Sequence, residues 1–206
     1  MQLETQLENR RGLEFFLPQG APRKAVSVVE VVPFDESGLA AETNRFLETG
    51  IESLFRVNTY VLVHEPDVTG IIDLLTGKPF VDPIIHRATL NESLALQLGL
   101  PFDYVLQSML NPGTSDADGD TALRQMLLAL GRDFRDGDVG FFSRQYFLKG
   151  DISPGKLEEI SGFFANPDLN ARRIIPRKDY EACVRVEAPI VVLKPEINDK
   201  IGRAHV

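Results

Sequence analysis

The sequence predicts an α+β protein made of two divergent copies of one β-α-β-α-β unit. Valine-rich or aromatic segments alternate with segments of helical spacing, and glycine, proline and asparagine separate them. The same order of elements then occurs a second time. The chain has 206 residues, enough for one large domain or two small ones. We expect an N-terminal arm at 1–23, units at 24–90 and 102–178, a linker at 91–101 and a C-terminal tail or connector at 179–206.

The first unit begins with a segment dense in valine, which is typical of a buried strand. Apolar residues after Gly38 then recur at helical spacing, and a short amphipathic helix precedes Gly77, a residue suited to a helix C-cap. In order, the predicted elements are a strand at 24–34, a helix at 39–54, a strand at 55–64, a helix at 68–75 and a strand at 81–90.

The second unit has clearer helix boundaries. Ser115 or Asp116 can cap its first helix, and Ser153 followed by Pro154 predicts the start of its second. The predicted elements are a strand at 102–110, a helix ending at Gly131, a strand at 139–149, a helix stopped by Asn166-Pro167 and a strand at 169–175. The inward-facing residues of the second helix are expected to be Leu157, Ile160, Phe163 and Phe164. The linker holds one helical turn, SLALQL, and residues 1–23 are expected to be an arm or a frayed helix that leads to the first strand.

Spacings between the two copies are similar. Lys24 and Phe102 open them, 78 positions apart, and Tyr60 and Tyr146 in the middle strands are 86 positions apart. Asp82-Pro83 and Asn166-Pro167, before the last strands, are 84 positions apart. A single copy would leave a sheet face or edge exposed, which a second copy can cover. We therefore expect a covalent pseudo-dimer, able to exist as a monomer.

Composition narrows the classes of partner. A net charge of −8 argues against nucleic acid and anionic membranes, which bind clustered lysine and arginine. The single cysteine, Cys183, excludes an internal disulfide. The start of the sequence lacks the apolar stretch of a secretory signal, and no apolar run is long enough to cross a bilayer. We expect a cytoplasmic protein whose partners are other proteins or small molecules.

The histidines and the cysteine allow several interpretations. His64, in the sequence HEPD, could belong to a metal site or an acid/base pair, or could lie at a polar strand end. His86 alternates with apolar neighbours and suits a hydrogen-bonded position in a sheet, and His205 belongs to the tail. Cys183 is expected to be a buried or incidental thiol. None of these residues predicts a catalytic site.

Charged and aromatic clusters are also ambiguous. The loop Asp116–Asp120 resembles the first calcium ligands of an EF-hand, but the later glutamate is missing, which favours helix capping. A second acidic run, Asp133–Asp138, suits a turn. A basic patch near the last strand could be a solvated edge or a docking site for an acidic partner: Arg172, Arg173, Arg177 and Lys178. The pairs Phe141-Phe142 and Phe163-Phe164 are expected in the core. Phosphate-binding glycine motifs are missing, so we predict no catalytic, cofactor-binding or metal-binding residue.

The second copy resembles a known family. It reads D-x-x-G-x-x-A at Asp116, Gly119 and Ala122, and FFANPDL at the end of its second helix. With the strand SRQYFLKGD between them, this is similar to PurS, the small subunit of phosphoribosylformylglycinamidine synthase. The phrase LPFDYVLQSMLNPGTSDADGDTA (100–122) resembles the duplicated PurS-like N-terminal part of a large-subunit synthase. The likeness covers residues 24–178; the first copy keeps the Asx-Pro-aliphatic phrase but no Asp-x-x-Gly helix start.

The resemblance implies a PurS-like, ferredoxin-like-related fold and a role in purine biosynthesis. That synthase is a ligase that uses ATP, magnesium and glutamine, and its PurS-like units are not catalytic. They bridge the synthetase and glutaminase parts and support ammonia transfer. This chain would then have no cofactor of its own. Two alternatives stay open: a small-molecule-binding regulatory α+β domain, and a stand-alone enzyme that uses the carboxylates of HEPD or DADGD.

Overall fold

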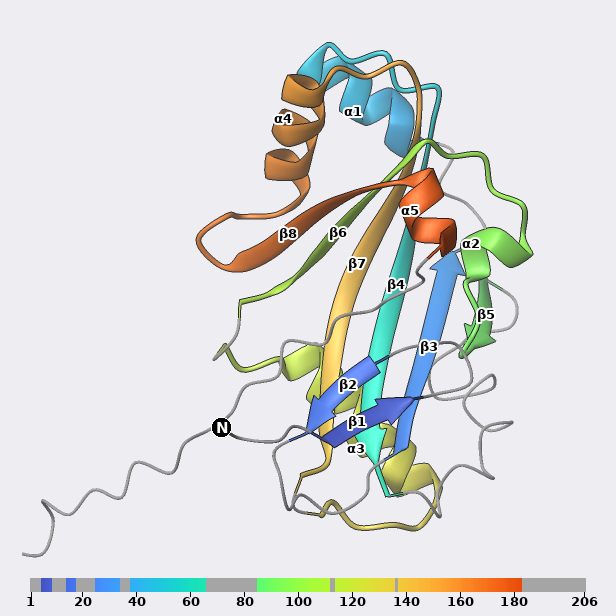
Figure 1. Ribbon diagram of the computed structural model, residues 1–206, viewed down its shortest axis with the longest axis vertical. Coiled ribbons are helices and arrows are strands. Elements are labelled where there is room, and N and C mark those ends of the chain that lie inside the picture. The colour runs from blue at the N-terminus through green and yellow to red at the C-terminus, as the bar shows by residue number, and fades with distance from the viewer. Residues whose placement is uncertain are drawn as a thin grey trace, which may run out of the picture.

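The structure is a computed structural model that describes residues 5–8, 14–17, 25–33, 38–65, 85–111, 114–135 and 137–182 (Figure 1). Its strands are β1 (Thr5–Glu8), β2 (Glu14–Leu17), β3 (Ala25–Pro33), β4 (Ser53–His64), β5 (His86–Leu90), β6 (Tyr104–Leu110), β7 (Val139–Lys149) and β8 (Asn170–Pro176). Its helices are α1 (Leu39–Leu47), α2 (Leu94–Gln97), α3 (Ala117–Ala129), α4 (Pro154–Phe164) and α5 (Arg177–Ala182). The predicted α+β class is confirmed.

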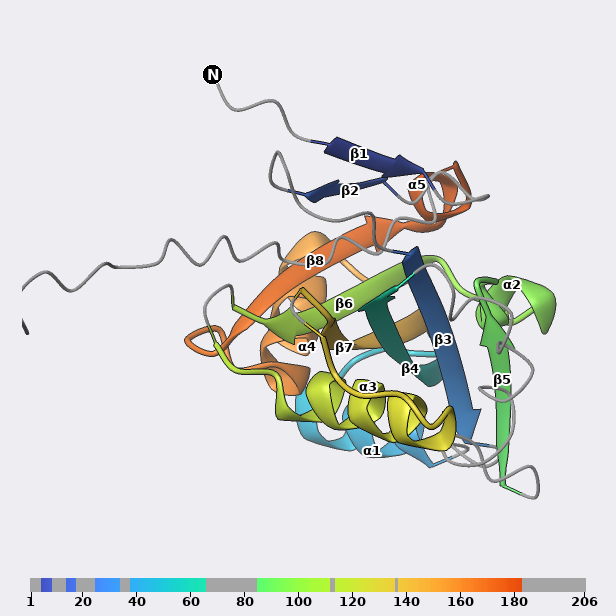
Figure 2. The same cartoon turned by 90° about the horizontal axis from the view of Figure 1, so that it is seen from below.

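One six-stranded antiparallel sheet spans both halves of the chain, in the order β5-β3-β4-β7-β6-β8. Its two central strands come from different halves. Strand β4 pairs with β7 over eleven residue pairs, from Ser53 opposite Lys149 to Val63 opposite Val139. Each strand therefore covers a backbone edge that the other half would otherwise expose. A separate two-stranded sheet, β1-β2, lies on the side of the large sheet away from α3 (Figures 1 and 2).

The large sheet has helices on both faces. Helices α1, α3 and α4 lie on one face, which we call the three-helix face (Figure 2). Side chains alternate along each strand, so Val29, Leu62, Leu106 and Tyr146 point to this face. Their neighbours in sequence point to the opposite face, where α2 and α5 cover a cluster that includes Val57, Val105 and Phe147. The sheet is thus the middle layer of the fold.

The three-helix face is divided into two apolar clusters, one toward each end of the central strands. The α3 cluster packs Leu123, Met126 and Leu127 against Val29 and Leu62. The α1–α4 cluster packs residues of both helices against the start of β4 and against β6 and β7. Its buried members are Ile51, Leu54, Leu106, Tyr146, Leu148, Ile152, Leu157 and Ile160. Figure 1 shows α3 and the α1–α4 pair at opposite ends of β4 and β7.

Several predicted boundaries are close to those observed. The strand at 139–149 and the helix start at Ser153-Pro154 are confirmed, and the helical turn in the linker is α2. The strand predicted at 81–90 is observed from His86. The helix predicted at 68–75 lies outside the described residues.

Two predictions about helices are wrong. The first helix ends at Leu47 instead of reaching Leu54, because Glu48 adopts a left-handed conformation with φ of 50° and its N–H bonds to the Asn44 carbonyl. Leu54 lies in β4. Phe163 does not face inward: it is 47% exposed. The region expected to be an arm or a frayed helix contains β1 and β2, in keeping with Phe15 and Phe16, which favour strands.

Helix α3 contacts β7 through two glycines. A Cβ atom built on Gly119 would overlap the backbone carbonyl of Gly140, and one built on Gly140 would overlap the backbone of Gly119. Gly119 and Ala122 are both buried on the face of α3 that contacts the sheet. The small residues of the D-x-x-G-x-x-A motif therefore allow this helix to lie directly on the strand.

We expect Gly119→Ala to lower the free energy of unfolding by about 1–3 kcal/mol, because the added methyl must push helix and strand apart. The matched control is Gly155→Ala in α4, where a Cβ would meet nothing within 4 Å. This change should raise stability by about 0.5–1 kcal/mol, the usual effect of replacing a helical glycine. Urea denaturation measures both, and equal effects of the two changes would contradict the close approach.

Candidate functional site

The acidic run Asp116–Asp120 forms the N-cap and first turn of α3, and its first residue caps the helix, as the sequence predicts. Asp116 is the N-cap residue, and its Oδ1 accepts a hydrogen bond of 2.8 Å from the N–H of Gly119. Its Oδ2 accepts a second bond of 2.7 Å from the N–H of Phe142, which fastens the helix to β7. Burial raises the pKa of Asp116, while these two bonds oppose the rise and the charges of Asp118 and Asp120 add to it. Asp116, the first residue of the D-x-x-G-x-x-A motif, thus caps α3 and holds it on β7.

His64 is part of a buried polar pair on the first two strands of the large sheet. It is 1% exposed, as is Ser27, whose Oγ lies 2.8 Å from His64 Nε2. The other ring nitrogen, Nδ1, lies 2.9 Å from the carbonyl oxygen of Glu65. A carbonyl only accepts, so Nδ1 carries the proton and Nε2 accepts from the serine hydroxyl. This tautomer and the burial indicate a structural histidine at a strand end, one of the interpretations left open above.

A second buried polar network joins three segments that are distant in sequence. Glu30 in β3, 2% exposed, accepts a bond of 2.6 Å from the N–H of Leu94 at the start of α2. Ser93 Oγ lies 2.9 Å from the hydroxyl of Tyr180 in α5. The pKa of Tyr180 is raised, first by burial and then by the charge of Glu30, while the bond to Ser93 opposes the rise. The network fixes the linker and α5 to the sheet.

This network is not among the features predicted from sequence. Residues 179–206 are predicted to form a tail or connector, whereas Tyr180 is 4% exposed and packs edge-on against Phe102 and Phe147, with ring centroids 5.6 and 5.4 Å away. The available signal was Glu30, a single charged residue in a run of valines. A buried carboxylate requires a donor, and a backbone N–H at a helix start is a common one.

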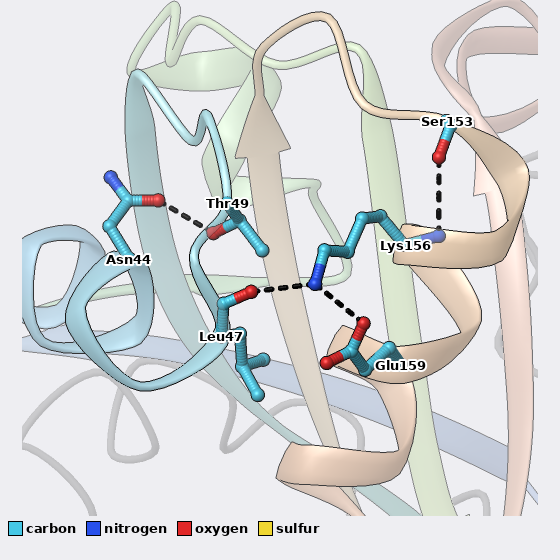
Figure 3. A network of polar contacts seen from close by, with 6 residues as sticks. All are labelled: Asn44, Leu47, Thr49, Ser153, Lys156 and Glu159. Carbon is cyan, nitrogen blue, oxygen red and sulfur yellow. Dashed lines mark hydrogen bonds and ion pairs between the residues drawn. The ribbon is translucent and has the colours of Figure 1, made fainter.

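Helices α1 and α4 are joined by a lysine (Figure 3). Lys156 Nζ donates to the carbonyl of Leu47, at the last turn of α1, over 2.7 Å, and to Glu159 over 2.7 Å. A cation at a helix C-terminus satisfies a carbonyl that has no partner within the helix. Beside this contact, the rings of Phe46 and Phe163 stack with centroids 6.1 Å apart, and both are exposed, 58% and 47%. We call these two residues the aromatic pair.

The predicted basic patch does not form one surface. In the register of β8 with β6, Arg172 lies opposite Ser108 and Arg173 lies opposite Gln107. Successive residues of a strand point to opposite faces, so the two arginines lie on different faces of the sheet. Arg177 belongs to α5, where its Nε donates to Glu181 over 2.7 Å. Arg172 instead faces α4 and lies on the same face as Arg144 in β7. Strand alternation is the physical reason that the patch is divided.

The remaining candidates are separate from one another. His86 lies at the start of the edge strand β5, while Cys183, His205 and Asp67 lie outside the described residues. Within the described part of the chain, no group of three or more His, Cys, Asp or Glu side chains converges as metal ligands. Asp138, in the second acidic run, accepts a turn-closing bond from the N–H of Arg135.

One small hollow lies near the end of β4. It is lined by Glu65, Leu127, Arg132, Asp133, Arg135 and Asp138. Its volume of about 10 Å³ accommodates a water molecule but not a metabolite. The charged residues around it therefore do not form a substrate site.

Comparison with protein-family models finds no match, and comparison with curated proteins also finds none. Among the residues that the structure describes, no helix combines the length and the apolar character that crossing a membrane requires.

Tyr180→Phe tests the buried network. Loss of the hydroxyl that contacts Ser93 should lower the free energy of unfolding by about 1 kcal/mol at neutral pH. Because burial raises the pKa of Tyr180 above its ordinary value of 10.0, the folded state resists ionisation. The stability it contributes is complete below about pH 10 and is lost as the pH rises further.

Wild-type protein should therefore lose stability more steeply above about pH 10 than Tyr180→Phe does. Urea denaturation at a series of pH values measures this difference. Tyr104→Phe, at a half-buried position in β6, is the matched control. Parallel pH profiles for wild type and Tyr180→Phe would show that the hydroxyl is accessible to solvent.

Proposed function

We propose that the chain is a non-catalytic assembly component of a glutamine-dependent synthase of the phosphoribosylformylglycinamidine synthase kind, built from two PurS-like units that form a covalent pseudo-dimer. In this role it bridges the synthetase and glutaminase parts and supports ammonia transfer between them. The sequence likeness of the second unit supplies the family. Strand register, helix packing and the aromatic pair supply the physical support.

Strand register supports the duplication. With Tyr60 and Tyr146 taken as equivalent, 86 positions apart, their partners on the first strands of the units are Val29 and Leu106, 77 positions apart. The partners of those residues on the last strands are Leu90 and Ile174, 84 positions apart. These offsets are close to the 78 and equal to the 84 expected from the sequence. A similar pairing scheme therefore occurs in each half of the sheet.

Helix packing also supports a pseudo-dimer, because each unit has a helix that packs against the other unit. Helix α3, from the second unit, places Leu123, Met126 and Leu127 on strands β3 and β4 of the first. Helix α1, from the first unit, contacts the cluster that contains Leu106 and Leu148 of the second. Removal of either unit would expose apolar surface of the other to water. This exposure costs a free energy of about 25 cal/mol per Å² of apolar surface.

The main support for an assembly role is the aromatic pair. Phe46 and Phe163 come from different units and are held side by side by the Lys156–Leu47 contact. Interfaces between proteins are enriched in aromatic residues, and an exposed, positioned aromatic surface can serve as an anchor for a partner. By contrast, the polar pairs of His64 with Ser27 and of Tyr180 with Ser93 are buried, and Asp116 is used for capping.

Interlocked units should not fold independently. Cleavage at an introduced protease site beside the exposed Gly99 would give fragments 1–99 and 100–206. We expect each fragment alone to lack a cooperative thermal transition, and an equimolar mixture to regain one, because the clusters under α1 and α3 contain residues of both units. The uncleaved protein with the same insertion is the control. A transition in fragment 100–206 alone that matches the intact chain would contradict the pseudo-dimer.

The functional test is glutamine-dependent amidine synthesis by the cognate synthetase and glutaminase. We expect activity with this chain and none without it. The double variant Phe46→Ser, Phe163→Ser should reduce the activity at least tenfold by weakening docking, since aromatic residues at interface hot spots contribute about 2 kcal/mol or more each. Its melting temperature should change little, because both rings are largely exposed.

The matched control is Leu128→Ser on α3, an apolar residue that is 79% exposed but outside the aromatic pair. It should leave both activity and melting temperature unchanged. Full activity of synthetase and glutaminase without the chain would refute the assembly role. Equal losses from the control and the double variant would refute the assignment of docking to the aromatic pair.

A further inference from the structure

A polar row crosses the three-helix face at the middle of the strands. Asn58 in β4 lies directly opposite Arg144 in β7. Arg144 lies opposite Ser108 in β6, and Ser108 lies opposite Arg172 in β8. The four residues therefore form one line across four neighbouring strands. Arg56, two positions before Asn58, points to the same face.

Apart from Arg56, which lies opposite Tyr146, the surroundings of this row are apolar, so the row is not a general feature of the face. On one side, the adjacent cross-strand line contains Tyr146, Leu106 and Ile174 under α1 and α4. On the other side it contains Tyr60 and Phe142, whose ring centroids are 5.1 Å apart. The row thus lies between the two apolar clusters, and it is accessible: Arg144 is exposed, and Asn58, Ser108 and Arg172 are partly exposed.

The chemistry of the row is that of an oxyanion site. Among the described residues, neither Arg144 nor Arg172 has an ion-pair or hydrogen-bond partner; Arg144 lies 5.2 Å from the centre of the Phe142 ring. Other arginines are differently placed, since Arg177 is paired with Glu181. Asn58 Oδ1, which is buried and has no hydrogen bond within the described part of the chain, only accepts and so suits a donor group of a ligand instead of its oxyanion. Two arginines, a serine and an asparagine thus lie on one accessible line of the sheet, with the Arg144 guanidinium over Phe142 and that of Arg172 beside Gly162 of α4.

The charge of the row is positive even though the whole chain carries −8. The charges of Asp118 and Arg144 both shift the pKa of Tyr60, so the Asp118 carboxylate lies near the row, on its α3 side. The two arginines of the row, Arg144 and Arg172, outnumber it. Guanidinium groups bind phosphate through paired N–H donors, and an amide or hydroxyl can bind a second polar group of the same ligand.

We propose that this row binds the phosphate group of a small phosphorylated molecule. Arg144 and Arg172 lie two strands apart, about 10 Å between their backbones, with Ser108 between them. Long arginine side chains can converge over that distance on one phosphate. Helices bound the row toward both ends of the strands, so a broad protein surface would meet the helices before it reached the sheet, whereas a small ligand would not. The site is independent of the proposed assembly role.

Calorimetric titration of the full chain at low salt tests this proposal. The probes are inorganic phosphate, a nucleoside monophosphate and the corresponding nucleoside. We expect saturable binding of the monophosphate, weaker binding of inorganic phosphate and none of the nucleoside. Binding of inorganic phosphate as tight as that of the ester would restrict the ligand to free phosphate, within the same oxyanion chemistry.

Arg144→Gln and Arg172→Gln should each weaken binding at least tenfold, and the double variant should abolish it. Arg173→Gln is the matched control, because it removes the same charge from the same strand on the opposite face. Thermal melting of each variant confirms folding, and Arg144→Gln, at an exposed position, keeps the test valid if Arg172→Gln fails to fold. Lack of binding of either phosphate compound, or equal weakening by Arg173→Gln, would overturn the proposal.

Discussion

The pairing of β4 with β7 is the constraint on which the rest of the structure depends. It joins the two halves of the chain into one sheet through eleven consecutive residue pairs. Because the strands are antiparallel and aligned near their middles, α1 and α4 meet at one end while α3 covers the other. The same register brings Asn58 opposite Arg144, and so creates a polar row between two apolar clusters. A shift by one residue would turn every side chain of one strand to the wrong face.

Buried polar residues, among them the candidates Asp116 and His64, serve to hold the fold together. Asp116 satisfies two backbone N–H groups, Glu30 satisfies one, and His64 pairs with Ser27. Burial of such groups is costly unless each finds a partner, and here each group has at least one partner from another segment: Phe142 for Asp116, Leu94 for Glu30 and Ser27 for His64. The accessible chemistry lies elsewhere: in the aromatic pair on α1 and α4, and in the arginines of the polar row. Both surfaces combine residues from the two halves of the chain.

Local signals predicted much of the secondary structure. Ser153 with Pro154 and Asp116 mark helix starts through their own side chains and backbone, so neighbours in sequence suffice to find them. The helix predicted to continue to Leu54 failed because Asn44 bonds both the N–H and the carbonyl of Ile51 and holds the turn after Leu47. Helical spacing alone could not detect that competing contact. The prediction that Phe163 faces inward is wrong because its ring stacks on Phe46 of α1, a contact between helices that spacing within α4 does not reveal.

The sequence by itself determined the α+β class, the alternation of strands and helices, and the positions of several element boundaries. These follow from side-chain periodicity and from residues that start or stop helices, which are local properties. Tertiary structure decided the rest: the single shared sheet, the division of Arg172 and Arg173 between its faces, and the placement of Tyr180 in the core. The reason is that strand register and helix docking depend on contacts between residues far apart in the chain, which composition and spacing do not encode.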